Sequence, residues 1–402
     1  MVDEKKRPNK DRVFQIDVLK GLAIIAVILQ HTMNSNDLIG AAAGTAVASA
    51  AAPSVSSFQI FGPALVTLLS LSFRQAVPVF VVLLGVNSGM SFIRRGIVSL
   101  KAGYSRDYIE RRFKRFYVPF LMIFAVSLLI GLIETYLSGI SHIHLSIFAL
   151  IGEIPLIGQM PAFAPGNYFI VLVFEFVLVF PLLFYLYRRR PRLLLVACFV
   201  IGFVYNILLL FSQVITSGVY VAQVPITFIL RFFPAIALGL WLSQDFGLRS
   251  KRNRFILFGS LIAVLFFVLN ALSVYGVATP PLGGWVGILY PFALFYPALL
   301  VMVCIKYLPS EATSRFLSSI AYCGKASYHI FLVQMLFFNL FAFFGVLTLL
   351  NPSSNLLLDA VIVAGNIVCC VALGVLFMHG NAALKRQWRV LRTKMKSRVR
   401  VE

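Results

Sequence analysis

The stretch FILFGSLIAVLFFVLNALSV, residues 255–274, carries no charged side chain. It has about the 20 residues that an α-helix needs to cross the apolar core of a bilayer. Hydrophobic residues make up 60% of the chain and charged residues 12%, against about 25% charged in ordinary soluble domains. A water-soluble domain could not bury so much apolar surface. The sequence therefore predicts an all-α, polytopic transmembrane helix bundle.

About ten segments of this kind follow one another along the chain. We predict spans at residues 14–33, 75–93, 116–138, 168–187, 193–212, 223–243, 255–275, 286–306, 327–349 and 356–379. An even number of spans places both termini on the same side of the membrane.

The formal net charge of +21 would indicate a nucleic-acid partner in a soluble protein. Here nearly all Lys and Arg residues fall into six clusters, with two predicted spans between successive clusters. The clusters lie at residues 5–20, 94–115, 188–192, 249–254, 306–325 and 385–400. All six can face one side, which the positive-inside rule identifies as the cytoplasm. We therefore expect cytoplasmic termini, a location in the plasma (inner) membrane, and no nucleic-acid partner.

We divide the chain into a transmembrane domain, residues 1–380, and a basic cytoplasmic tail, residues 381–402. The tail is expected to contact anionic membrane lipids, at about 1 kcal/mol for each cation near the surface. The first apolar run is expected to remain as a helix, because the small residues typical of a signal-peptide cleavage site lie well past its end. The five cysteines show no metal-ligand spacing, so we interpret them as packing residues and expect no metal.

The first span contains three ionisable residues, and such residues are costly inside a membrane. Lys20 and His31 are eleven positions apart, so they share one helix face about 16 Å apart along the axis. Asp17 precedes Lys20 by one turn and can pair with it. Two interpretations stay open at this point: an ion pair with a core histidine, or a functional site.

Later segments add further polar residues. Glu175 and Arg231 are predicted at similar depths, either as a structural ion pair or as a substrate-binding pair. Arg112 and Arg115 belong to a cytoplasmic cluster that can hold a polyphosphate, although positive-inside charge explains it equally well. Gln334 lies in the ninth predicted span without an evident partner.

Several short motifs, in order along nearly the whole chain, resemble those of the acyltransferase 3 family of membrane proteins. They are IDVLKGLAI at 16–24 continuing to His31, VPVFVVLLG at 77–85, RFKRFYVP at 112–119, NYFI at 167–170, Phe233-Pro234 with Leu238-Gly239, and GKASYHIFL at 324–332. Three positions depart from the family pattern. Lys20 replaces the usual Arg, Leu84 replaces a common Ser, and Gln334 stands where many members carry His.

The resemblance implies transfer of an acetyl or similar acyl group from acyl-CoA, usually acetyl-CoA. The acceptor would be a hydroxyl of a cell-envelope glycan or lipid-linked sugar. His31 and Glu175 are the implied catalytic residues; the ordinary histidine pKa of about 6.5 leaves neutral imidazole available as a base. Lys20, Arg112 and Arg115 are expected to hold the phosphates of the donor.

Arg231 and Gln334 are the implied acceptor-binding residues. A transporter or flippase that exports a polysaccharide or glycolipid without covalent chemistry would use the same charged cavity. A structural subunit of a glycan synthase is a third alternative. Binding of CoA and the effect of His31→Ala distinguish the enzyme from the transporter. Activity of the purified chain alone would argue against the structural subunit.

Overall fold

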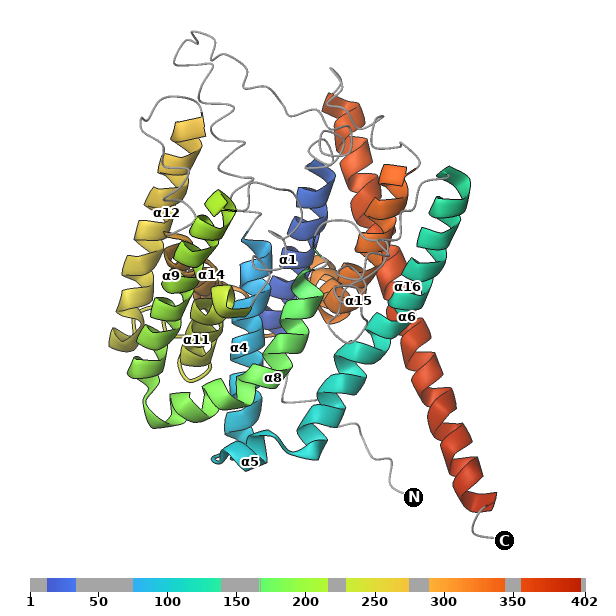
Figure 1. Ribbon diagram of the computed structural model, residues 1–402, viewed down its shortest axis with the longest axis horizontal. Helices are drawn as coiled ribbons and strands as arrows, with labels where there is room; N and C mark the ends of the chain where they lie inside the picture. The colour runs from blue at the N-terminus through green and yellow to red at the C-terminus, as the bar shows by residue number, and fades with distance from the viewer. Residues whose placement is uncertain are drawn as a thin grey trace.

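The computed structural model describes residues 13–33, 75–138, 166, 168–215, 229–274, 289–343 and 356–398. These residues form helices joined by turns and contain no strand (Figure 1). The predicted all-α class is thereby confirmed.

The helices have the following bounds: α1 Phe14–Met33, α4 Ala76–Arg94, α5 Leu100–Gly103, α6 Arg106–Ser138, α8 Tyr168–Arg189, α9 Pro191–Ile215, α11 Phe233–Leu242, α12 Arg254–Val274, α14 Phe295–Tyr307, α15 Arg315–Phe343 and α16 Leu356–Arg398. Two short 3-10 helices, η1 Ile229–Phe232 and η2 Lys251–Asn253, precede α11 and α12.

Seven of the described helices are long and apolar enough to cross a membrane. They are Phe14–Thr32, Ala76–Arg94, Leu100–Leu137, Tyr168–Arg189, Pro191–Leu209, Leu289–Tyr307 and Ala360–Gln387. The protein is thus a multi-pass membrane protein. The predicted spans at 223–243, 255–275 and 327–349 overlap η1 with α11, α12 and α15. The count of ten and the cytoplasmic placement of both termini stay predictions.

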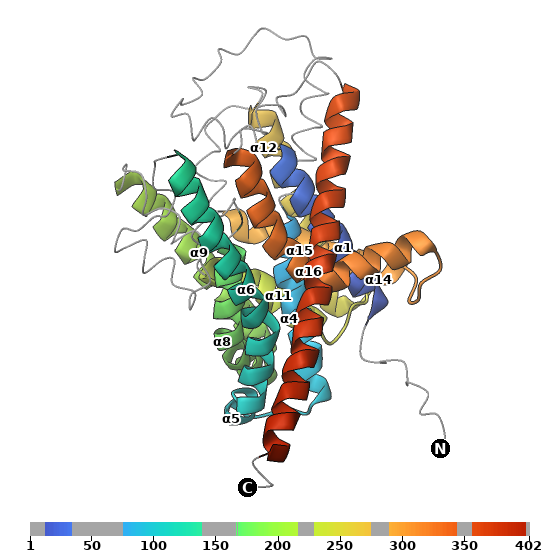
Figure 2. The same cartoon turned by 90° about the vertical axis from the view of Figure 1, so that its right-hand side faces the viewer.

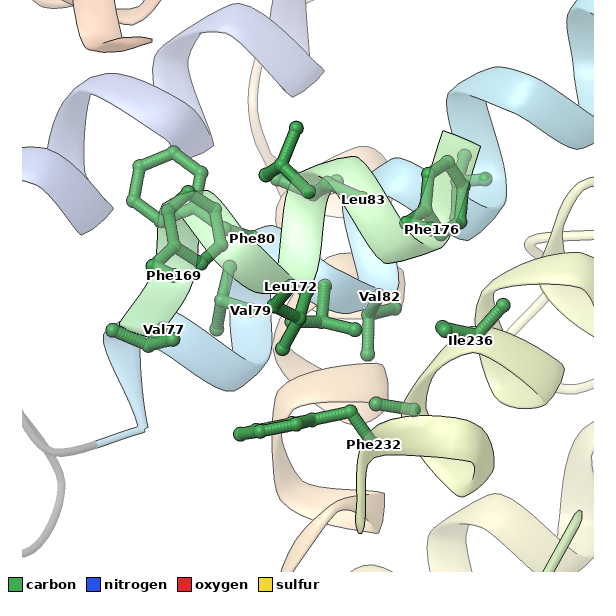
Figure 3. Close-up of a cluster of buried hydrophobic side chains, with 14 of the residues drawn as sticks. Val77, Val79, Phe80, Val82, Leu83, Phe169, Leu172, Phe176, Phe232 and Ile236 are labelled. Atoms are coloured by element: carbon green, nitrogen blue, oxygen red, sulfur yellow. The ribbon is translucent and has the colours of Figure 1, made fainter. Parts of the chain in front are cut away.

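Helices α4 and α11 form the centre of the bundle. Every residue of α11 is buried, and so are most residues of α4. A helix that is apolar on all sides belongs inside a protein or in lipid. Figure 3 shows side chains of α4 packed against those of α8, η1 and α11. Peripheral helices such as α9 and α12 instead expose Leu and Val, as lipid-facing helices do.

Helices α1 and α15 pack directly on each other through two glycines. A Cβ atom at Gly21 would collide with the carbonyl oxygen of Ile320, and one at Gly324 with that of Asp17. Small residues allow this close backbone approach in membrane helices. The pairing fixes α1, which carries Lys20 and His31, against α15.

Helix α16 continues without interruption from Leu356 to Arg398. Its 43 residues are more than a bilayer core of about 30 Å requires. Its C-terminal end reaches the same end of the molecule as α5 (Figure 2). The basic tail predicted from residue 381 therefore begins as a continuation of the last helix.

Candidate active site

A cavity of about 620 Å³ lies among α1, α4, α6, α8 and α15. Its volume is typical of small-molecule sites, which range over about 300–1,000 Å³. Cations from four of these helices line it: Lys20, Arg94, Arg95, Arg112, Arg115 and Lys325. Asp17 is the one carboxylate among the lining residues. The cavity is therefore suited to an anionic ligand.

Lys20 and Asp17 lie on the cavity wall formed by α1. The Lys20 Nζ atom is 3.9 Å from Asp17 Oδ1, which confirms the pairing predicted from their spacing. Only 3% of the Asp17 side chain is exposed, against 18% for Lys20. The ammonium group of Lys20 thus stays accessible to a ligand while its charge is partly balanced.

Arg112 is fixed in the cavity by two contacts. Its Nη2 atom donates a hydrogen bond to Ser88 Oγ at 2.9 Å. Its guanidinium also lies over the Tyr108 ring, 5.5 Å from the centroid. Arg115, one turn later on α6, lies 5.3 Å from the centroid of Phe116. The structure thus brings together the three cations predicted to hold a donor, and Ser88 is a supporting residue that the sequence did not reveal.

Three phenylalanines close the cavity at the end away from these cations. Phe80 and Arg94 both line it from α4, and their separation of 14 positions corresponds to a depth of about 21 Å. Phe80 contacts Phe169 at a centroid distance of 5.8 Å, and Phe169 contacts Phe331 at 4.9 Å. Figure 3 shows Phe80 and Phe169 side by side. We call Phe80, Phe169 and Phe331 the ring layer.

His31 lies beyond the ring layer and does not line the cavity. A Cβ atom at Gly166 would be 3.3 Å from His31 Nε2 and 3.6 Å from Phe331 Cζ. The side chains of His31, from α1, and Phe331, from α15, therefore both lie next to Gly166. The His31 ring also contacts Phe338, 5.8 Å away between centroids.

Gly166 lies directly beside His31 Nε2. Its φ angle of 115° belongs to a region that residues with a side chain rarely adopt. A side chain at this position would strain the backbone and cover the imidazole. Gly166 is a second residue of the site that its place in the sequence did not reveal.

Gln334 lies one turn beyond Phe331 on α15. It is fully buried, and neither atom of its amide has a hydrogen-bond partner among the residues that the structure describes. Residues three and four apart share a helix face, so Gln334 lies on the side of α15 that carries Phe331 and Phe338. An unpaired buried amide costs about 1–3 kcal/mol, which makes it a candidate contact for a ligand.

A family model described as an acyltransferase domain matches residues 13–375 of the chain. The chain belongs to the acyltransferase 3 family. The match covers every helix that lines the cavity, together with His31 and Gln334. The protein is therefore a membrane acyltransferase. No curated protein and no solved structure matches the chain.

Two further predicted site residues of this acyltransferase, Glu175 and Arg231, lie outside the cavity. Glu175 Oε2 accepts a hydrogen bond from the backbone N–H of Ile229 at 2.9 Å. The Arg231 guanidinium lies over the Tyr290 ring, 4.2 Å from the centroid. Among the described residues, the two are not joined by an ion pair within 4.0 Å. The carboxylate instead fixes the start of η1, the turn that carries Arg231.

His329 is a lining residue of the acyltransferase cavity to which the sequence assigned no role. Its Nε2 atom lies 3.0 Å from Asn381 Nδ2, so α16 supports the cavity wall. Within the described part of the chain, no group of three or more His, Cys, Asp and Glu residues could hold a metal ion. All five cysteines are free.

Proposed function

We propose that this membrane acyltransferase moves an acetyl or similar acyl group from cytoplasmic acyl-CoA to a sugar hydroxyl. The acceptor is a cell-envelope glycan or a lipid-linked sugar, and the enzyme works in the plasma (inner) membrane. One observation carries the proposal: a deep cavity has cations at one end and a ring layer at the other, with His31 directly behind that layer.

The basic end of the cavity suits the phosphates of CoA. Lys20, Arg112 and Arg115 supply positive charge from two helices, and guanidinium groups bind phosphate oxygens in a bidentate manner. The depth of about 21 Å suits the long pantetheine arm. In this orientation the thioester points toward the ring layer and His31.

His31 acts as the general base of the reaction. Its Nε2 atom accepts the proton of the acceptor hydroxyl while the hydroxyl oxygen attacks the thioester carbonyl. A C–O bond forms and the C–S bond breaks. The proton passes to the departing sulfur, so the products are an O-acyl sugar and free CoA. The Gln334 amide, which is buried and has no hydrogen-bond partner among the described residues, binds the reacting groups near His31.

Glu175 and Arg231 serve the acceptor side. Arg231 is half-buried, and its Nε atom has no hydrogen-bond partner among the described residues. We assign this buried Nε–H as a donor to a sugar oxygen of the acceptor. Glu175 holds the η1 turn in place and thereby orients Arg231.

The deciding experiment measures transfer of labelled acetyl from acetyl-CoA by the purified protein in nanodiscs, with glycan acceptors present. We expect His31→Ala to lower the rate by about 10²–10⁴-fold, the usual contribution of general acid–base catalysis. His379→Ala is the matched control, because His379 is exposed on α16 and contacts Tyr322 rather than the cavity. A wild-type protein that neither binds CoA nor transfers acetyl would instead favour a transporter or flippase.

A further inference from the structure

The ring layer separates the two halves of the site. Phe80, Phe169 and Phe331 come from three different helices and are 9%, 6% and 2% exposed. All three line the cavity, whereas His31 does not. An acyl group that enters with its thioester from the basic end therefore has to pass between these rings to reach His31.

We propose that the ring layer selects the acyl group by its width, an inference that rests on the acyl-CoA function proposed above. The part of the pantetheine arm next to the thioester, cysteamine followed by β-alanine, is an unbranched chain. Because Phe331 and His31 lie around the same point at Gly166, this part is the one that passes the layer, which must open at least that far in every turnover. A linear acyl group is no wider than this part of the arm and passes with it. A branched or aromatic acyl group is wider and is rejected. The substrate class is therefore acyl-CoA with a linear acyl group.

Phe331 is the decisive member of the layer. Its side chain lines the cavity. Its Cζ atom also lies beside Gly166, next to His31 Nε2. Its edge-to-face contact with Phe169 closes the passage. Such buried aromatic contacts are closely packed, and one additional carbon that does not fit a packed apolar site lowers the rate by about 10- to 200-fold. Shortening Phe331 therefore widens the passage without removing any cation of the cavity or His31.

The test compares acetyl-, butyryl-, isobutyryl- and benzoyl-CoA as donors for the full-length protein in nanodiscs. We expect the wild type to use the isobutyryl and benzoyl donors at least about 10-fold less well than the two linear donors. Phe331→Ala is expected to raise the ratio of benzoyl to acetyl transfer by about 10-fold or more. The ratio of butyryl to acetyl transfer should stay at its wild-type value, because both chains are equally narrow.

Phe180→Ala is the matched control. Phe180 is fully buried on α8, the helix of Phe169, but it contacts Phe92 and Phe184 and does not line the cavity. It should leave both ratios unchanged, which separates widening of the passage from general loosening of the core. Phe331→Leu and Phe169→Leu repeat the test with a smaller cavity if Phe331→Ala does not fold.

Two negative outcomes are distinguishable. If the wild type transfers acetyl and the folded Phe331 variants still bind CoA, unchanged ratios overturn the width filter alone. A parallel rise for butyryl and benzoyl also overturns it, because the layer would then respond to length. If the wild type binds no CoA and transfers no acyl group, the proposed acyltransfer function fails and the filter with it.

Discussion

The basic end of the cavity and the region around His31 differ in how their polar groups are paired. At the basic end, Lys20 contacts Asp17 and Arg112 donates to Ser88. Around His31, the fully buried amide of Gln334 has no partner in the described part of the chain. Under the function proposed above, the cations that bind the donor are already held in place, whereas the Gln334 amide is left for a ligand to pair with. Substitutions near His31 should therefore impair transfer, and substitutions at the basic end should impair CoA binding.

After His31→Ala, the largest effect is expected from Gly166→Ala. The new methyl group would lie 3.3 Å from His31 Nε2 on a backbone with a φ angle of 115°. We expect acetyl transfer to fall by about 100-fold, as when reacting groups are slightly misplaced, with the Kd for CoA unchanged. Gly365→Ala is the control, because an added Cβ there meets nothing within 4 Å. Weaker CoA binding in Gly166→Ala would contradict the assignment of CoA binding to the basic end alone.

The next largest effect concerns the basic end. Arg112→Gln removes a charged donor of the kind that contributes about 1.5–3 kcal/mol to a hydrogen bond, so CoA should bind roughly 10- to 100-fold more weakly. The single-turnover rate from bound acetyl-CoA should stay the same. Arg189→Gln is the matched control, since Arg189 also lies over a tyrosine, Tyr185, but outside the cavity. A slower single-turnover rate with unchanged Kd would contradict the assignment.

Gln334→Met is expected to have a smaller effect, which raises stability and lowers transfer. Methionine has a similar shape and leaves no buried polar atom, so the free energy of unfolding should rise by about 1–3 kcal/mol. Transfer should fall by about tenfold, because the ligand loses a hydrogen bond in a buried site. Thermal unfolding and acetyl transfer of the same preparation measure both. A variant that is more stable and equally active would remove Gln334 from the site.

The smallest effect is expected for Lys20→Arg. The substitution restores the residue that the family usually carries and keeps the positive charge opposite Asp17. Since arginine adds a bidentate fork, the Kd for CoA should decrease by no more than about threefold. Isothermal titration with CoA measures this. A change of more than about tenfold in either direction would mean that side-chain geometry, rather than charge, sets donor affinity at this position.

The sequence predicts those parts of the molecule that depend on local patterns. Long apolar runs predict the helices, and positions three apart on one helix predict the pairing of Lys20 with Asp17. Arg112 and Arg115, which are also three positions apart on one helix, both line the cavity. In each case the side chains lie on a single helix, and their spacing along the sequence determines which of them share a face.

Contacts between helices are not predictable in this way. Ser88 meets Arg112 because α4 and α6 are packed at a particular height, and a serine in an apolar span gives no sign of it. The similar predicted depth of Glu175 and Arg231 suggested that the two side chains pair. The Glu175 carboxylate instead accepts a hydrogen bond from the backbone N–H of Ile229. The first N–H groups of a short helical turn have no partner within the turn, so they attract such an acceptor. The approach of Gly166 to His31 likewise joins residues far apart in the chain, so no local pattern reveals it.

Close glycine contacts join four helices of the bundle in two pairs. Gly21 and Gly324 bring the backbones of α1 and α15 together, and Gly85 and Gly239 do the same for α4 and α11. Phe331 belongs to the first pair together with Lys20 and His31, whereas Phe80 belongs to the second. A shift of one pair against the other would therefore separate Phe331 from Phe80. Lys20 and His31 lie on one helix, so such a shift would leave the distance between them unchanged.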